Sequence, residues 1–170
     1  MQNITPCLWF DKNCEEAMNF YVKTFQNSPS VKGESKILSK KYYPENSSDE
    51  HMKGMEGKIL TGIFTLAGQR FMALDGGPVF KFNEAISLMV ECDDQAEVDY
   101  FWDKLSAAPE SEQCGWLKDK FGLSWQIIPK TLGILLNSQE KEKSMRALNA
   151  MLQMKKIDIN ELQKAFDGKK

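Results

Sequence analysis

The sequence predicts an α+β fold in which a βαβββ module (strand, helix, strand and hairpin) occurs twice and a pair of helices follows. Sliding the chain by 81 residues places Asn13 on Asp94 at two helix starts, and sliding it by 54 places Gly68 on Gly122 at two hairpins. The difference of 27 residues (81 minus 54) is largely explained by the polar stretch 40–57 of the first module. The expected parts are a first module, a second module and C-terminal helices, over residues 1–80, 81–132 and 133–170.

The first module begins with a strand over residues 4–10, which are rich in β-compatible types, and Pro6 favours an edge or strand-start position. Asn13 and Glu16 form a capping-box pair for the next helix. Its apolar face is made by Cys14, Ala17, Met18, Tyr21 and Phe25. A weakly patterned strand (31–39), a long loop (40–57) and a hairpin (58–66 and 70–74, turning at 67–69) complete the module.

The second module repeats this order. Residues 85–90 form the expected strand, and Asp94 with Glu97 is the second capping-box pair. The apolar helix face that follows consists of Val98, Phe101, Trp102 and Leu105. Residues 113–129 alternate apolar positions around an Asp-Lys-Phe-Gly turn, which predicts a hairpin because glycine adopts positive φ at little cost. Alternation places Trp125 and Ile127 against the helix, and it places Ser124, Gln126 and Ile128 on the opposite face.

The C-terminal region is predicted to contain two amphipathic helices. Asn137 with Glu140 is the expected cap of the first, and Asp158 with Glu161 is the expected cap of the second, which ends at Gly168. Such a pair can pack on its own sheet or on a second copy of the chain, and we favour the second copy, a homodimer.

Composition excludes several classes of partner. The chain has 22 Lys+Arg against 24 Asp+Glu, so no basic excess attracts nucleic acid or an anionic membrane surface. No apolar run reaches the length of about 18 residues that spans a bilayer. The four cysteines show neither metal-binding nor paired spacing, and the first residues lack a signal-peptide pattern. We therefore expect reduced thiols and a cytoplasmic location.

Several stretches together resemble one known family. They are Trp9 with the helix 11–25, residues 67–78, residues 85–87, residues 98–102 and, above all, residues 114–129. The chain resembles, over about residues 3–132, the PhnB-like group of the glyoxalase/bleomycin-resistance/dihydroxybiphenyl dioxygenase superfamily, which has the vicinal oxygen chelate fold. Members are often labelled 3-demethylubiquinone-9 3-methyltransferase domains. The resemblance implies paired βαβββ modules that form a cupped mixed sheet, commonly in a homodimer.

The resemblance also implies where a metal-dependent relative would carry its ligands, on the first and last strands of each module. The corresponding positions here are Ile4 or Pro6, Ala85 or Ser87, Met72 and Gln126. These residues offer too little charge and donor strength for a divalent metal, so we expect no metal and no cofactor. A register shifted by one residue would present Thr5, Phe71, Ile86 and Trp125 instead, which is no better.

The remaining candidates are ligand-binding residues. Ser87, Ser124 and Gln126 can hydrogen-bond a polar ligand or can satisfy groups inside the sheet. Cys114 beside Trp116 is a thiol without a second histidine to activate it. The candidate set of ligand-binding residues is Ser87, Cys114, Trp116, Ser124, Gln126 and His51, whereas Lys118 and Asp119 are expected to flank the turn.

The function predicted from these residues is the binding of an unknown small organic molecule without a competent metal site. The alternative is an enzyme that uses the loop around His51, whose neighbours Asp49, Glu50 and Glu56 could form a metal cluster or an acid–base pair. The methyltransferase label finds no support, because the glycine cluster at residues 75–78 is not followed by a helix that could present amides to a nucleotide-like ligand. Whether the chain is an enzyme stays open at this point.

Overall fold

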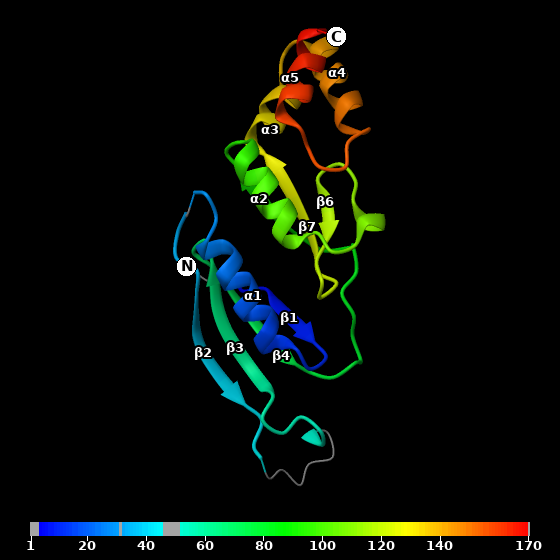
Figure 1. Ribbon diagram of the computed structural model, residues 1–170. Coiled ribbons are helices and arrows are strands. Elements are labelled where there is room, and N and C mark those ends of the chain that lie inside the picture. Colours follow the sequence, from blue (N-terminus) through cyan, green and yellow to red (C-terminus); the bar gives the residue numbers. More distant parts are fainter. Residues whose placement is uncertain (1–3, 31, 46–51, 170) are drawn as a thin grey trace. The chain divides into compact units, whose positions relative to one another are not determined.

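The computed structural model describes residues 4–30, 32–45 and 52–169. The chain divides into two compact units, Met1–Phe82 and Asn83–Lys170. Figure 1 labels the helices and strands of both units. Each unit combines one small mixed sheet with helices, so the predicted α+β fold class is confirmed.

The first unit contains a four-stranded sheet of order β1-β4-β3-β2 and one helix (Figure 1). β1 runs parallel to β4, whereas the β4–β3 and β3–β2 pairs are antiparallel. The elements are β1 (Cys7–Phe10), α1 (Cys14–Gln26), β2 (Lys36–Tyr42), β3 (Ile59–Leu66) and β4 (Gln69–Asp75). A helix between β1 and the later strands is the crossover that a parallel pair requires.

The core of the first unit lies between α1 and one face of the sheet. Alternation along the strands sends Leu8, Phe10, Phe64 and Phe71 to this face, and all four are buried. The predicted apolar face of α1 is confirmed, because Cys14, Ala17, Met18, Tyr21 and Phe25 are all buried. The hydrophobic period of the sequence therefore places this helix correctly on the sheet.

The start of α1 corrects one prediction. Asn13 precedes the helix but makes no side-chain cap hydrogen bond, so the Asn13–Glu16 capping box is wrong. The Asp75 carboxylate takes its place: Oδ1 accepts from the Cys14 amide at 2.8 Å and Oδ2 accepts from the Ile59 amide at 3.3 Å. A residue 61 positions away in sequence supplies the cap, which a local pattern cannot reveal.

The strand after α1 also differs from its predicted bounds of 31–39. β2 begins at Lys36 and continues to Tyr42, so the first residues of the predicted loop 40–57 belong to a strand. Lys40 and Lys41 pair with Gly62 and Thr61 of β3. These residues are polar because β2 is the edge strand of its sheet, and charged residues are typical of edges.

The second unit contains a three-stranded sheet of order β5-β7-β6, in which β5–β7 is parallel and β6–β7 antiparallel (Figure 1). The elements are β5 (Ser87–Cys92), α2 (Gln95–Leu105), a 3-10 turn η2 (Pro109–Ser111), β6 (Trp116–Lys118) and β7 (Ser124–Pro129). A βαβββ module would have four strands. The described residues of the second unit form only three, so this part of the prediction is corrected. The segment between α2 and β6, where the further strand was expected, forms η2 instead.

The second helix confirms its predicted cap and face. Asp94 accepts from the Glu97 amide at 2.9 Å, and Val98, Phe101, Trp102 and Leu105 are buried. The Glu97 carboxylate accepts from the Asp93 amide at 2.6 Å, one residue earlier than a capping box predicts.

The C-terminal region contains three helices, α3 (Lys130–Leu136), α4 (Lys141–Met151) and α5 (Ile159–Asp167). α3 was not predicted, and Asn137 ends this helix rather than starting the next. α4 follows Glu140 without a side-chain cap, so the Asn137–Glu140 cap is wrong. Asp158 caps α5 by accepting from the Glu161 amide at 3.0 Å, and Gly168 ends it at φ +73°, both as predicted.

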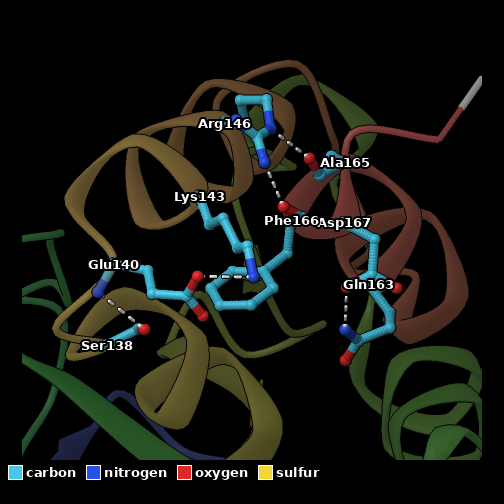
Figure 2. Close-up of polar contacts among 8 residues, drawn as sticks. All are labelled: Ser138, Glu140, Lys143, Arg146, Gln163, Ala165, Phe166 and Asp167. Atoms are coloured by element: carbon cyan, nitrogen blue, oxygen red, sulfur yellow. Dashed lines mark hydrogen bonds and ion pairs between the residues drawn. The ribbon is translucent and has the colours of Figure 1, made fainter.

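These three helices share a small core of their own. Leu132, Leu135, Ala147, Ile157 and Leu162 are its buried members. Figure 2 shows the polar contacts beside it, where Arg146 of α4 donates to the carbonyl oxygens of Ala165 (3.0 Å) and Phe166 (2.6 Å) at the end of α5. Arg146 thus adds donors to carbonyl groups of the last turn of α5, one of which, that of Ala165, also accepts from the Gly168 amide.

Candidate functional site

The candidate site lies on the face of the second sheet opposite α2, which we call the polar face. The strand register places Met89, Gln126 and Trp116 in one row across the sheet. A second row consists of Ser87, Ser124 and Lys118. The opposite face carries the buried Trp125, Ile127 and Leu117, and α2 packs on it. The predicted division of β7 into a core side and a polar side is thus visible in the structure.

Gln126 and Ser87 are direct partners on the polar face. The Gln126 amide nitrogen donates to the Ser87 hydroxyl oxygen at 2.8 Å. The structure therefore brings together two residues that are 39 positions apart in sequence. Each keeps unused capacity: the amide has a second N–H and a carbonyl oxygen, and the hydroxyl can still donate.

Ser124 differs from both of these residues. It is only 1% exposed, and its hydroxyl makes no hydrogen bond to any residue that the structure describes. Most buried polar side chains in proteins have a partner, so such a hydroxyl requires an explanation. It lies between Ser87 and Lys118 in the second row of the polar face.

Trp116 and Lys118 come from β6, and both are partly buried. The Lys118 ammonium group is paired with the carboxylate of Glu84. This hydrogen bond lowers the pKa of Glu84 below its ordinary value. The positive charge at this edge of the polar face is therefore already partnered. The groups left for a ligand are the neutral serines and Gln126, with the exposed Glu91 carboxylate in the row beyond them.

Cys114 lies in the turn before β6 rather than on a strand. Its backbone adopts φ +51°, a left-handed conformation that is uncommon for residues other than glycine. Its amide donates to the Met154 carbonyl oxygen at 2.8 Å. The sequence contains no signal for this conformation, since Gly115 next to it would be the expected left-handed residue.

Asp119 closes the β6–β7 hairpin, as the sequence predicts for a residue that flanks the turn. Its carboxylate accepts from the amides of Phe121 (2.8 Å) and Leu123 (3.0 Å) and from the indole N–H of Trp125 (2.8 Å). The side chain is 3% exposed, so these bonds fix the hairpin from inside. Asp119 is therefore a structural residue of the candidate site.

The first sheet offers a different surface on the face opposite α1. β1 pairs with β4 so that Cys7 lies beside Met72 and Trp9 beside Leu74. Ile4 or Pro6 was expected to share the face of Met72, and this is wrong by one residue, because the parallel register places Cys7 on that face beside Met72. Across β3 the row continues to Ile63. This row is apolar apart from the Cys7 thiol, whereas the next row of the same face pairs Thr65 with Arg70.

The glycine cluster after β4 packs against Trp9. The Trp9 indole donates to the Gly77 carbonyl oxygen at 2.9 Å, and a Cβ atom on Gly76 would lie 2.2 Å from Trp9 Cζ2. Gly76 is thus needed for the close approach of an aromatic ring. The cluster has this local packing role, which a phosphate-binding loop would not require.

Among the residues that the structure describes, no group of three or more His, Cys, Asp or Glu side chains could hold a metal ion. His51, Asp49 and Glu50 lie outside the described residues, so the hypothesis of a loop-borne site stays a prediction. Glu56 is described and is exposed, and its carboxylate accepts from the Gly54 amide at 3.1 Å.

Two surface hollows are lined by residues that do not belong to the polar face. One, of about 190 Å³, is lined by residues that include Lys12, Glu15 and Lys58 of the first unit. The other, of about 290 Å³, is lined by residues that include Trp102 and Glu112 of the second unit. Neither contains a predicted site residue. No helix within the described residues is long and apolar enough to cross a membrane.

The fold and the polar face define the class of protein. Each unit has a small mixed sheet in which the last strand runs parallel to the first, and a crossover helix follows the first strand. The resemblance described in the sequence implies this repeated arrangement. The family model described as 3-demethylubiquinone-9 3-methyltransferase matches residues 2–128, and the chain belongs to this family.

Solved structures agree with this assignment. A PhnB protein from Bacillus cereus, provisionally described as a 3-demethylubiquinone-9 3-methyltransferase, is 37% identical, with a TM-score of 0.59 over 75% of this chain and 99% of that chain. Protein PA1353 from Pseudomonas aeruginosa is 19% identical, with a TM-score of 0.55 over 76% and 98% of the two chains. No match was found among curated proteins. The resemblance to the PhnB-like group is therefore confirmed.

Proposed function

We propose that this chain binds a small organic molecule on the polar face of the second sheet, without a metal ion. Ser87, Ser124 and Gln126 supply the hydrogen bonds, and Trp116 supplies an aromatic surface. The observation that carries the proposal is the buried Ser124 hydroxyl, which has no partner among the described residues. Because this hydroxyl is buried, a ligand reaches it only when a neighbouring side chain of the polar face moves aside, and its hydrogen bond would then remove the penalty of leaving the hydroxyl unsatisfied.

The chemistry of the polar face indicates the class of ligand. The two serine hydroxyls and the Gln126 amide are neutral, and the charge of Lys118 is paired with Glu84. Trp116 and Met89 lie beside Gln126 in the same row and add apolar surface. An uncharged aromatic molecule with one or two hydrogen-bonding groups fits this combination best.

Fluorescence titration with N-phenyl-1-naphthylamine, an uncharged aromatic probe with one N–H donor, tests the proposal. Gln126→Ala should weaken probe binding about 10-fold, because it removes a hydrogen-bonding group and releases Ser87. Gln69→Ala is the matched control, since Gln69 is an exposed glutamine of the first unit whose side chain bonds only the Arg70 carbonyl oxygen. Equal affinity of the wild type and Gln126→Ala would contradict the proposal.

The absence of a metal requirement is tested separately. Metal analysis of the purified wild type and the His51→Ala variant, with and without a chelator, should give no stoichiometric metal and unchanged probe binding. A stoichiometric metal that is lost in His51→Ala would instead support the enzyme alternative. Mass spectrometry of molecules that co-purify with the protein would identify the natural ligand directly.

A homodimer in the cytoplasm belongs to the same proposal, and the resemblance to the PhnB-like group and the composition of the chain support it. Light scattering after size-exclusion chromatography should give a mass twice that of the chain. A mass equal to one chain at micromolar concentration would remove the dimer from the proposal but would leave the binding site unaffected.

A further inference from the structure

The C-terminal helices hold a turn of the polar face in place. Residues 152–158 connect α4 to α5, and we call this segment the linker. It runs beside residues 113–116, the turn that leads into β6. The Cys114 amide donates to the Met154 carbonyl oxygen and the Gly115 amide to the Lys155 carbonyl oxygen, each at 2.8 Å.

The same turn is bonded on its other side to β7. The Gly115 carbonyl oxygen accepts from the Ile127 amide at 2.8 Å. A Cβ atom on Gly115 would lie 2.7 Å from Ile128 Cδ1 and 3.3 Å from Ile157 Cγ1, so side chains of β7 and of the linker both close on this glycine. The turn is therefore clamped between the sheet and the C-terminal region.

The backbone of the turn needs such support. Cys114 and Gly115 have φ values of +51° and +86°, and the first is unfavourable for a residue with a side chain. Left-handed conformations of this kind persist where the surrounding structure holds them. The two hydrogen bonds from the linker act on these two residues, and Trp116 follows immediately on the polar face.

Gln95 at the start of α2 fixes the linker. Its amide nitrogen donates to the Ile157 carbonyl oxygen at 3.1 Å, and its side-chain oxygen accepts from the Ile159 amide at 2.9 Å. Lys156 adds an ion pair to Asp99 on the same helix at 2.6 Å. The other end of α5 is held by Arg146, as Figure 2 shows, so both ends of this helix are anchored.

The C-terminal helices lie outside the part of the chain that the family model matches, residues 2–128. We propose that they are a positioning element for the ligand site: the linker sets the conformation of residues 114 and 115 and thereby the place of Trp116 on the polar face. This inference rests on the proposed binding function. It assigns to Gln95 a role as a positioning residue, since it contacts the linker and not the polar face.

The test compares Gln95→Ala with Gln163→Ala in the full chain. Gln163 is a glutamine of α5 whose exposed side chain, among the described residues, bonds Asp167 and not the linker (Figure 2), so its removal leaves the linker intact. In Gln95→Ala the amides of Cys114 and Gly115 should exchange hydrogen about 10-fold faster, because the segment that holds them opens more easily. The indole N–H resonance of Trp116 should shift, and N-phenyl-1-naphthylamine should bind several-fold more weakly.

Each outcome decides the inference. Unchanged exchange at Cys114 and Gly115 in Gln95→Ala would overturn it, and so would faster exchange with an unmoved Trp116 resonance. If Gln95→Ala does not fold, Lys156→Ala removes the ion pair to Asp99 instead. It should accelerate amide exchange and shift the Trp116 resonance in the same directions, by smaller amounts. If the wild type binds no probe, the proposed function fails in its tested form, while the Trp116 resonance still shows whether the linker positions the turn.

Discussion

The two sheets follow one plan on the core side and differ on the opposite face. In the first unit the face opposite α1 carries Cys7, Met72 and Ile63 in one row, whereas the corresponding row of the second unit carries Met89, Gln126 and Trp116. The helix side is apolar in both units because it must exclude water. The other face is not constrained in this way. Two similar modules can therefore keep one fold while the middle row of this face is apolar in one of them and carries the Gln126 amide in the other.

Each unit contains a buried aspartate that accepts several hydrogen bonds, Asp75 in the first and Asp119 in the second, and the two differ in the elements that they join. Asp75, at the end of β4, joins the start of α1 to the start of β3. Asp119, just after β6, joins the two arms of its own hairpin and the indole of Trp125. The first carboxylate therefore holds distant elements together, and the second holds a local turn.

The largest expected difference is in the reactivity of two thiols of the first unit, that of the exposed Cys7 on β1 and that of the buried Cys14 in α1. Burial, reinforced by the charge of Asp75, raises the pKa of the Cys14 thiol from 9.0 to about 12. Its thiolate fraction at pH 8 is then about 1,000-fold lower than that of an ordinary thiol. Iodoacetamide labelling followed by peptide mass spectrometry should modify the exposed Cys7 and leave Cys14 unmodified. Equal labelling would show that α1 opens readily.

The same shift predicts the alkaline stability of the first unit. Because folding raises the Cys14 pKa, this group contributes a stability that is fully present below pH 9.0 and is lost as the pH rises toward about 12. Denaturant unfolding between pH 8 and 11 should show this decline in the wild type. Cys14→Ala should show a smaller dependence on pH, and a decline of the same size in both would assign it to other groups.

Removing Asp119 should destabilise the second unit by about 3 kcal/mol, since three donors lose their acceptor in a buried site. Asp119→Asn keeps one acceptor oxygen and should lose less than Asp119→Ala. Urea unfolding followed by tryptophan fluorescence measures both. If Asp119→Ala unfolds like the wild type, the hairpin does not depend on this carboxylate.

Ser124→Ala should separate folding from binding. Removing a buried hydroxyl without a partner among the described residues should raise the free energy of unfolding by about 1 kcal/mol. It should also weaken the binding of N-phenyl-1-naphthylamine. Cys7→Ala, on the face of the first sheet opposite α1, is the control and should leave probe binding unchanged. A Ser124→Ala variant that is less stable than the wild type would show that the hydroxyl is satisfied.

The smallest expected effect is at the hairpin between β3 and β4. Its two loop residues, Ala67 and Gly68, have φ values of +48° and +84°, as a type I′ turn requires. Asparagine tolerates this conformation better than alanine, so Ala67→Asn should raise the free energy of unfolding by about 0.5 kcal/mol. Thermal unfolding measures the gain, and a loss of stability would mean that the turn is not of this type.

The sequence predicted those parts of the fold that follow from local periodicity. The apolar faces of α1 and α2 could be identified from the helical period. The caps Asp94 and Asp158 and the turn at Asp119 could be identified because their hydrogen-bond partners lie within a few residues. The cap of α1 could not, because Asp75 acts across 61 residues of sequence. α3 was missed because it begins directly after β7 without a connecting loop, and its seven residues are too few to show a helical period.

The candidate site was predicted only in part. The alternation in β7 identified Gln126 and Ser124, and the register of β5 then brought Ser87 to them. In the first unit the same reasoning failed by one residue, because nothing in the sequence shows whether Pro6 or Cys7 stands beside Met72. The contact of the linker with Cys114 is made by backbone atoms alone, so it could not be predicted from residue types.

The bonds of Asp75 have a consequence for the order of folding. Its carboxylate can exchange water for the Cys14 and Ile59 amides only after α1 has docked and β3 has paired, and these partners are 61 and 16 residues away. Long-range contacts of this kind form after local ones because of their loop-closure entropy. Substitution of Asp75 should therefore accelerate unfolding and leave the folding rate nearly unchanged. The residue would protect the folded state against opening without helping the chain to reach it.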